Sequence, residues 1–501
     1  MKKKILLICK EKNSLSFYNS LEKLSKEFII DVFFFMPHEN EKNENCYFIK
    51  LFKENNFVNK IYSTSSLVEE FLIAKKNSIK PNISFLSKIE KNFKDFKNIR
   101  MQLNAVQFFS TYFHDRKIYE DVSNNDQLIF YEMYYKKVLQ ILNDSEPSYI
   151  FENDISEFRT IIYELSRQKN IPYILAALSY YKDYYIPNFN LQAKADDWLI
   201  ENVKNEKNFN HKHFSTPKEF RYKYIAEAKK YFSLTPRVIL REIYFFFKTF
   251  FYIPNILSTS RSTFVTPRSF SRKILNLKIV LKKIIIKYFV SFDEIDFEDK
   301  KCLIFPLSVI PEGSTFTLSP LFLNERSCIE LVSNCLPVDY KLVLKEHPVM
   351  LGQRSVSFYK EIQKLPNVFF LNPNINYGIN ELINNSCAVV TISGTVGLEA
   401  IMLKKPVILF ANTLYSFLDG CYIFKNIKTF KDDLNDILNK NKLRENSSLL
   451  NYISTIKKFG KKIDITILNS VNQFTLKQVE KNVINFIEVF KIGIKLNSKY
   501  D

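Results

Sequence analysis

The chain has 501 residues, 46% of them hydrophobic, which is too long for a single core and predicts a folded protein of two domains plus additions. Every stretch of 18 residues contains a charged side chain, so no transmembrane helix is predicted. The formal net charge is +19, and the seven cysteines show no Cys-x-x-Cys spacing, which excludes an evident disulfide framework or zinc site and favours reduced thiols in the cytoplasm.

The first half of the chain has the pattern of an α/β domain. The apolar run within residues 1–9 is too short for a signal peptide and is not followed by a cleavage site. We therefore expect a buried strand there. A mostly helical, polar region is expected up to about residue 144. The other expected elements, in order, are strands at 5–8 and 28–35 around a helix at 15–27, then a strand at 148–151, a helix at 155–169 and a strand at 172–175.

Two carboxylates, Glu152 and Asp154, follow the expected strand at 148–151. Open α/β sheets bind ligands at the carboxyl ends of their strands, so either residue is a candidate general base. Helix capping is the alternative interpretation. Asp154 in particular precedes an expected helix and is followed three residues later by Glu157, which is a variant of the capping box.

The segment from Lys218 to Lys287 carries much of the positive charge, with 16 Lys and Arg residues against three acids. Basic and aromatic residues alternate around 244–252. Residues 272–290 can form a helix, although the β-branched residues at 279–286 also allow a strand. Apolar residues on one face of such a helix would be Ile274, Leu277, Leu281, Ile284, Ile285 and Tyr288. Three interpretations stay open: interdomain packing helices, an anionic membrane surface, or a nucleic-acid patch for which no known motif is present.

Strand-like and helical stretches alternate in the second half. This alternation predicts a parallel, doubly wound sheet. A tail at 471–495 has helical spacing and is expected to run back across the molecule. The expected strands lie at 302–306, 340–345, 368–371, 388–392 and 407–411.

A glycine turn, Ser393-Gly394-Thr395-Val396-Gly397-Leu398-Glu399-Ala400, connects two of these strands. Such a turn directs backbone N–H groups and the positive end of a helix dipole at one point, which suits a phosphate. Glu399 would lie about one turn into the helix, within reach of a ribose. An ordinary strand-to-helix connection is the alternative.

Two further loops follow strands of the same half. Lys345-Glu346-His347-Pro348 ends one strand, and the proline fixes the backbone so that His347 lies at the rim, where it can donate to a phosphate or cap the chain locally. Another strand, at 302–306, is followed by the loop Pro311-Glu312-Gly313-Ser314-Thr315. We expect all three loops on one edge of one sheet.

Taken together, these motifs resemble the bacterial capsule polysaccharide biosynthesis proteins, which include the Kdo transferases of capsule assembly. The resemblance rests on the Pro-Glu-x-Ser-Thr loop, Lys-Glu-His-Pro, Arg354 and Tyr359 shortly after it, and Ser-Gly-Thr-x-Gly-Leu-Glu-Ala before Lys-Pro-Val. It covers 303–410 well and 152–172 more loosely.

The resemblance implies a GT-B fold, with two Rossmann-like domains facing a cleft and a helical basic segment between them. The implied domains are 1–195 on the acceptor side, 196–298 as basic segment, 299–455 for the nucleotide-sugar, and 456–501 as helices that pack back.

The resemblance also implies site residues. His347 would contact the donor phosphate, Ser393, Gly394 and Thr395 would cradle it, and Glu399 would hold the ribose or cytidine. Glu312 and Lys345 would line the cleft. The remaining implied donor-binding residues are Ser314, Pro348, Arg354 and Gly397. Neither a metal nor a cofactor is implied, because a helix dipole and side-chain donors neutralise the leaving phosphate.

The function predicted from this resemblance is a glycosyltransferase that passes an acidic sugar from a CMP-activated donor, such as CMP-Kdo, to a glycan or glycolipid acceptor. It would be cytoplasmic and peripheral at the inner face of the membrane, held there through 218–290, without a nucleic-acid partner. The alternatives are a CDP-glycerol-type glycerophosphotransferase, a sugar-nucleotide 2-epimerase, and a non-enzymatic scaffold at the membrane with a degenerate GT-B fold.

Overall fold

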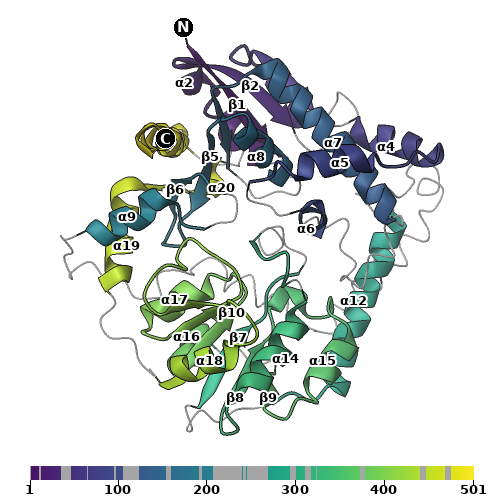
Figure 1. The fold of residues 1–501 in the computed structure, drawn as a ribbon, viewed down its shortest axis with the longest axis vertical. Coiled ribbons are helices and arrows are strands. Elements are labelled where there is room, and N and C mark those ends of the chain that lie inside the picture. Colours follow the sequence, from purple (N-terminus) through teal and green to yellow (C-terminus); the bar gives the residue numbers. More distant parts are fainter. Residues whose placement is uncertain are drawn as a thin grey trace. The chain divides into compact units, whose positions relative to one another are not determined.

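The computed structural model of the chain is shown in Figure 1. The residues that it describes are 2–10, 13–34, 47–64, 66–94, 98–104, 123–153, 159–190, 194–206, 240, 244, 269–293, 301–310, 318–322, 324–372, 378–439, 447–468 and 475–500.

The chain divides into two compact units. The first takes the described residues of 1–207 together with those of 451–501, and the second takes the described residues of 208–450. The predicted four-part division stays a prediction, because most of 196–298 lies outside the described residues.

The first unit is built on a seven-stranded sheet with the strand order β13-β6-β5-β4-β1-β2-β3. Five neighbouring strands are parallel to one another: β5, β4, β1, β2 and β3. At the other edge, β6 is antiparallel to β5, and β13 is antiparallel to β6. The strand bounds are β1 Lys3–Cys9, β2 Phe28–Phe34, β3 Lys60–Ser63, β4 Tyr149–Glu152, β5 Tyr173–Leu178, β6 Tyr184–Asn188 and β13 Lys461–Lys462.

Helices complete this unit, and the C terminus of the chain lies with it (Figure 1). The long helix α7 begins with a full capping box, in which Ser123 and Asp126 each accept from the other's backbone N–H. The helix bounds are α1 Ser14–Tyr18, α2 Leu21–Ser25, α3 Tyr47–Lys53, α4 Leu67–Lys76, α5 Ile83–Glu90, α6 Ile99–Asn104, α7 Asn124–Ser145, α8 Arg159–Gln168, α9 Asp197–Asn205, α19 Ser447–Phe459, α20 Ile465–Leu468 and α21 Leu476–Tyr500.

The second unit is built on a six-stranded sheet with the order β12-β11-β10-β7-β8-β9, and all of its described pairings are parallel. Its central strands are apolar and buried, as expected for a sheet that is covered on both faces. The strand bounds are β7 Cys302–Pro306, β8 Lys341–Lys345, β9 Val368–Phe370, β10 Ala388–Thr391, β11 Val407–Leu409 and β12 Cys421–Ile423.

Helices of the second unit alternate with these strands (Figure 1). Their bounds are α12 Ser269–Phe289, α14 Glu325–Cys335, the 3-10 helix η8 Pro348–Met350, α15 Val356–Ile362, α16 Ile379–Asn384, α17 Val396–Met402 and α18 Phe430–Asn439. Two units, each with a sheet of mainly parallel strands, confirm the predicted α/β class with Rossmann-like sheets.

The nine predicted strands are all present, whereas β3, β6, β12 and β13 were not predicted. The stretch at 279–286, for which a strand was also allowed, is helical in α12. The predicted helix at 15–27 is interrupted and forms α1 and α2. Among the described helices, none combines the length and apolar composition that crossing a membrane requires.

Candidate functional site

The three predicted loops of the second unit begin at the same edge of its sheet. Pro306 pairs with Lys345, and Val389 pairs with Ile304, so the carboxyl ends of β7, β8 and β10 lie level with one another. Figure 1 shows these strands side by side in the second unit. The described starts of the loops after these strands therefore lie on one edge, as predicted, whereas the predicted motif at 311–315 lies outside the described residues.

The order of the strands gives this edge a further property. From β7 the chain moves outward through β8 to β9, and then returns to the other side of β7 to form β10 and β11. The strand order therefore reverses between β7 and β10, which pair side by side in the sheet. In open α/β sheets this switch point is where ligands bind.

A buried cluster of charged side chains holds the loops after β7 and β8. Arg354 lies between two carboxylates: its Nη2 is 2.6 Å from Oε2 of Glu325, and its Nε is 3.0 Å from Oε2 of Glu346. The Tyr359 hydroxyl donates to the same oxygen of Glu346 at 2.7 Å. The arginine side chain is 7% exposed and the two carboxylate side chains are at most 1% exposed.

This cluster binds backbone groups of both loops. The N–H of Ser308 donates to Glu325 at 2.6 Å, and the C=O of Ser308 accepts from Arg354 at 2.8 Å. On the neighbouring loop, the N–H of His347 donates to Glu346 at 2.7 Å. The Arg354 guanidinium also lies over the ring of Phe358, 4.9 Å from its centroid. The cluster therefore fixes the start of each loop at the sheet edge.

Burial sets the protonation behaviour of the cluster. Burial raises the pKa of Glu325 above its ordinary value, although the charge of Arg354 and the bond from Ser308 oppose this. Burial alone would lower the pKa of Arg354, but Glu325 and Glu346 together raise it. Burial next to Glu346 raises the pKa of Tyr359 well above its ordinary value. One guanidinium thus serves two buried carboxylates.

His347 is placed at the rim, as predicted, and it also caps the chain locally. Its Nδ1 accepts from the N–H of Val349 at 3.3 Å, at the start of η8. In a neutral imidazole whose Nδ1 is an acceptor, the proton lies on Nε2. Both interpretations of the sequence are therefore compatible, because Nδ1 caps and Nε2 is a donor.

The glycine turn after β10 is held by the protein itself. The N–H of Gly394 donates to the Thr391 hydroxyl at 3.1 Å, and the C=O of Gly394 accepts from the hydroxyl of Tyr415. The Gly394 N–H is therefore occupied within the protein. The backbone N–H groups of Thr395 and Val396 come next, and at the start of α17 the helix itself provides them with no acceptor.

Two other residues of this turn are tightly enclosed. A Cβ at Gly397 would lie 2.3 Å from the hydroxyl oxygen of Tyr415, so only glycine fits beneath that ring. Glu399 lies in α17 and is 2% exposed. Its placement is therefore inside the unit, next to the turn, and contact with a ribose would require the side chain to reach out from there.

In the first unit, the predicted base Glu152 is the last residue of β4, next to the point where the strand order reverses between β1 and β4. Its side chain is buried against Arg159, with Oε2 3.4 Å from Nε and both side chains at most 2% exposed. The adjacent Asn153 amide donates to the C=O of Asn13 at 3.1 Å, which ties the loops after β4 and β1 together.

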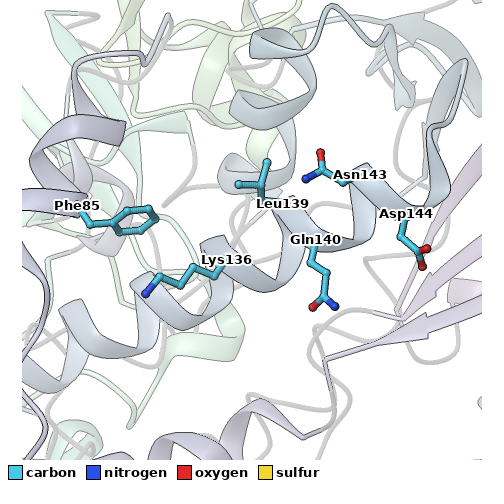
Figure 2. Close-up of a pocket in the computed structure, with 6 residues that line it drawn as sticks. All are labelled: Phe85, Lys136, Leu139, Gln140, Asn143 and Asp144. Atoms are coloured by element: carbon cyan, nitrogen blue, oxygen red, sulfur yellow. The ribbon is translucent and has the colours of Figure 1, made fainter.

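An open hollow of about 550 Å³ lies in the first unit along α5 and α7. Figure 2 shows its side chains spread along successive turns of α7 and at α5, instead of converging on one point. None of the residues predicted for the site lines this hollow. The lining residues are Phe85, Lys136, Leu139, Gln140, Asn143 and Asp144.

Three of the predicted site residues, Asp154, Glu312 and Ser314, lie outside the described residues. The structure also adds two site-forming residues that sequence reasoning missed, Glu325 and Tyr415. Glu325 begins a helix and resembles any acidic first-turn residue, and Tyr415 lies in an irregular segment, so neither carried a local signal. Donor and acceptor binding by the predicted residues stays a prediction.

Comparisons with known proteins give a family for part of the chain. Residues 328–429 match the family described as "Capsule polysaccharide biosynthesis protein". This range includes Lys345, His347, Arg354 and the whole glycine turn. A curated relative, "Protein FixF" of Sinorhizobium fredii (strain NBRC 101917 / NGR234), is 43% identical over 77 residues, which are 15% of this chain and 17% of that protein.

The similarity to solved structures is more distant. A β-Kdo 2,7 transferase structure of KpsC from Thermosulfurimonas dismutans is 9% identical, with a TM-score of 0.33, over 71% of this chain and 89% of that chain. The UDP-GlcNAc 2-epimerase from Methanocaldococcus jannaschii is 12% identical, with a TM-score of 0.24, over 92% of this chain and all of that chain. At these values neither likeness bears on the activity.

Proposed function

We propose that the chain, whose residues 328–429 match the capsule polysaccharide biosynthesis family, is a glycosyltransferase of surface polysaccharide synthesis. Its donor is a CMP-activated acidic sugar such as CMP-Kdo, and its acceptor is a glycan or glycolipid.

One observation carries the proposal. The loops after β7, β8 and β10 start level at the carboxyl edge of one parallel sheet, beside its switch point, and a single buried cluster holds two of them. A nucleotide-sugar needs several donors fixed around its phosphate before the reaction begins, because donors that must reorganise stabilise the transition state poorly. Fixed loop starts meet this requirement.

In the proposed reaction, the bond between the anomeric carbon of the sugar and the phosphate oxygen of CMP breaks, and its electron pair goes to the phosphate. The acceptor hydroxyl oxygen forms the new bond to that carbon. His347 donates from Nε2 to the phosphate, and the backbone N–H groups at the start of α17 donate from the other side of β7. Lys345 adds a positive charge at the end of β8.

The acceptor hydroxyl must also lose a proton, and Glu152 and Asp154 are the proposed bases. Burial against Arg159 weighs against Glu152, because a carboxylate that is at most 2% exposed and paired with a guanidinium is not presented to an acceptor hydroxyl. We therefore assign proton transfer to Asp154, and we assign to Glu152 the positioning of the loop that follows β4.

The first test is thermal stabilisation of the protein by CMP, CDP, UDP and GDP. A ligand at about 100 times its dissociation constant adds roughly 2.7 kcal/mol to the free energy of unfolding. We expect a shift with CMP that is lost in His347→Ala. The matched control is His211→Ala, a histidine outside the predicted site, which should keep the wild-type shift.

The second test follows transfer itself, with CMP-Kdo and a lipid-linked acceptor. Asp154→Asn should lower the rate about 10²- to 10⁴-fold with the CMP shift unchanged, as expected on loss of a general base. Stronger thermal stabilisation by UDP than by CMP would favour an epimerase instead. Stronger stabilisation by CDP would favour a glycerophosphotransferase. If none of the nucleotides stabilises the protein, the non-enzymatic scaffold at the membrane would be favoured.

The acceptor completes the proposed function. We propose that it is lipid-linked and that the protein meets it as a peripheral protein at the inner face of the membrane. The basic composition of 218–290 supports this, since anionic lipids attract clusters of Lys and Arg.

A further inference from the structure

The helix α12 (Ser269–Phe289) packs onto the second unit through one of its faces. Val280 and Ile286 are buried, and Ile286 joins the core cluster that contains Tyr359 and Leu344. The helix backbone also comes close to Gly352, where an added Cβ would lie 2.6 Å from the Ile279 carbonyl oxygen. The helix is therefore anchored, and its orientation on the unit is fixed.

The opposite face of α12 exposes large apolar side chains. Leu281 is 49% exposed, Ile285 40%, Tyr288 69% and Phe289 72%. Their spacing of four, seven and eight residues from Leu281 places them in one stripe along the helix. Because the buried face already packs on the unit, this stripe does not belong to its core.

The charge of α12 is of one sign. Its sequence contains Arg272 and five lysines, of which Lys278 and Lys287 are exposed in the structure, and it contains no acidic residue. Lys278 lies on the same side of the helix as the apolar stripe, and the Nζ of Lys287 lies 5.3 Å from the centroid of the Tyr288 ring. An exposed apolar stripe thus lies next to exposed positive charge.

This combination favours one class of occupant. A second copy of the helix would bring two positively charged surfaces together, which costs free energy unless acids intervene, and α12 has none. Nucleic acid would use the lysines but leave the apolar stripe in water. An anionic lipid bilayer uses both, because its headgroups attract lysines while Tyr, Phe, Leu and Ile side chains lie at the boundary with the acyl chains.

We propose that the face of α12 formed by Leu281, Ile285, Tyr288 and Phe289, with Lys278 and Lys287, docks on the surface of an anionic lipid bilayer. The inference deepens the membrane attachment in the proposed function, on which it rests, and it requires neither a donor nor an acceptor. It assigns to one helical face the membrane attachment that the basic composition of 218–290 only suggests.

The experiment is co-sedimentation of the full chain with vesicles, without nucleotide. We expect binding to vesicles of 70% phosphatidylcholine and 30% phosphatidylglycerol, weak binding to pure phosphatidylcholine, and a marked loss at about 0.5 M salt, where the Debye length is only a few Å. Tyr288→Ser with Phe289→Ser should lower the affinity roughly tenfold or more. Lys278→Glu with Lys287→Glu should lower it at least fivefold per lysine.

Matched controls use equally exposed residues of the first unit. Ile73 is 60% exposed and Ile83 is 55% exposed, and Ile73→Ser with Ile83→Ser should leave vesicle binding unchanged. The thermal midpoint of each variant checks its folding, which changes at exposed positions should preserve.

Wild-type vesicle binding by both α12 variants would overturn the proposal, as would equal binding to neutral and anionic vesicles. Loss of a dimer in the α12 variants, with no vesicle binding by the wild type, would replace the bilayer with a second copy. Competition by single-stranded RNA, with no vesicle binding, would replace it with nucleic acid. Vesicle binding without any nucleotide-induced stabilisation would leave this inference standing and refute only the proposed function.

Discussion

Gly397 shows how a single residue can be required by packing alone. It lies in α17 beneath Tyr415, whose hydroxyl oxygen would be 2.3 Å from an added Cβ and whose ring carbons would be 2.9 Å away. That hydroxyl also donates to the C=O of Gly394 in the same turn. The glycine therefore permits the contact that fixes the turn, and its place in the motif has a structural reason that is independent of any ligand.

We predict that Gly397→Ala destabilises the second unit by about 1–3 kcal/mol, because the added methyl group overpacks the ring of Tyr415. Urea unfolding followed by hydrogen exchange of β10 and β11 measures this. Gly378→Ala is the control, since its nearest atom would be 3.7 Å away. In the double variant Gly397→Ala with Tyr415→Ala, the two costs should be less than additive, and full additivity would contradict the packing argument.

Arg354 illustrates the difference between a motif residue and a binding residue. The resemblance placed it in the donor site, whereas its contacts in the structure are with Glu325, Glu346 and the backbone of Ser308. In the structure it therefore holds the starts of the loops after β7 and β8, and donor binding by Arg354 stays a prediction.

Arg354→Met should cost about 3–5 kcal/mol in the free energy of unfolding, because it leaves two carboxylates buried without their counter-charge. The comparison is Arg326→Met, on the surface of the same unit, where the guanidinium of Arg326 pairs with Glu330 at 42% exposure. We expect a far smaller effect there. Equal effects of the two changes in urea titrations would show that burial does not set the strength of the Arg354 cluster.

The cluster that joins the elements β7, β8, α14 and α15 should also give stability a distinct dependence on pH. Burial raises the pKa of Glu325 above its ordinary value of 4.5. The folded state therefore binds a proton more tightly than the unfolded state. The resulting stabilisation is complete below the ordinary value and is lost as the pH rises through the raised pKa.

Glu325→Gln removes this dependence while its amide oxygen can still accept from Ser308. We predict that the wild type loses stability relative to Glu325→Gln as the pH rises from 4.5 towards neutrality. The difference between the two unfolding free energies, measured by urea titration at several pH values, isolates Glu325 from the other carboxylates. A difference that is constant with pH, or that grows in favour of the wild type, would contradict the prediction.

Three of the four strands that the sequence did not predict share a physical property. β3, β12 and β13 lie at the outer edges of the two sheets, and their residues are partly or fully exposed. Central strands such as β7 and β8 are covered on both faces and therefore appear as apolar runs, which is the pattern that predicts a strand. A short edge strand such as Lys461–Lys462 has no such pattern, because only its pairing defines it.

The position of the candidate site on the sheet was also predictable from the sequence. The loops after β7, β8 and β10 could be placed on one edge because strand alternation fixes which ends of parallel strands meet. Which residues pair with one another inside the site could not be predicted. Glu325 lies 29 residues before Arg354 in the numbering, and only the packing of α14 against α15 brings the two side chains together.

At the scale of the whole molecule, the last helix of the chain completes the core of the unit in which the chain begins. α21 packs against β5, β6 and β13, and its apolar residues join the core cluster of β1 and β2. The ring of Phe490 stacks on that of Phe151 in β4, with centroids 4.4 Å apart and an interplanar angle of 17°. The core of the first unit therefore includes α21, although this helix is far from β1 in the sequence.

Phe490→Ala should destabilise the first unit by about 3–5 kcal/mol, because it opens a cavity against Phe151 in a core where Phe490 is 1% exposed. Trp198, the single tryptophan, lies in α9 of this unit and is 2% exposed, so its fluorescence reports the unfolding of this unit. Ile484→Ala on the same helix is the control, since Ile484 is 44% exposed and should change stability by no more than about 0.5 kcal/mol. If Phe490→Ala shifted the fluorescence transition no more than Ile484→Ala, α21 would be an appendage and not a part of the core.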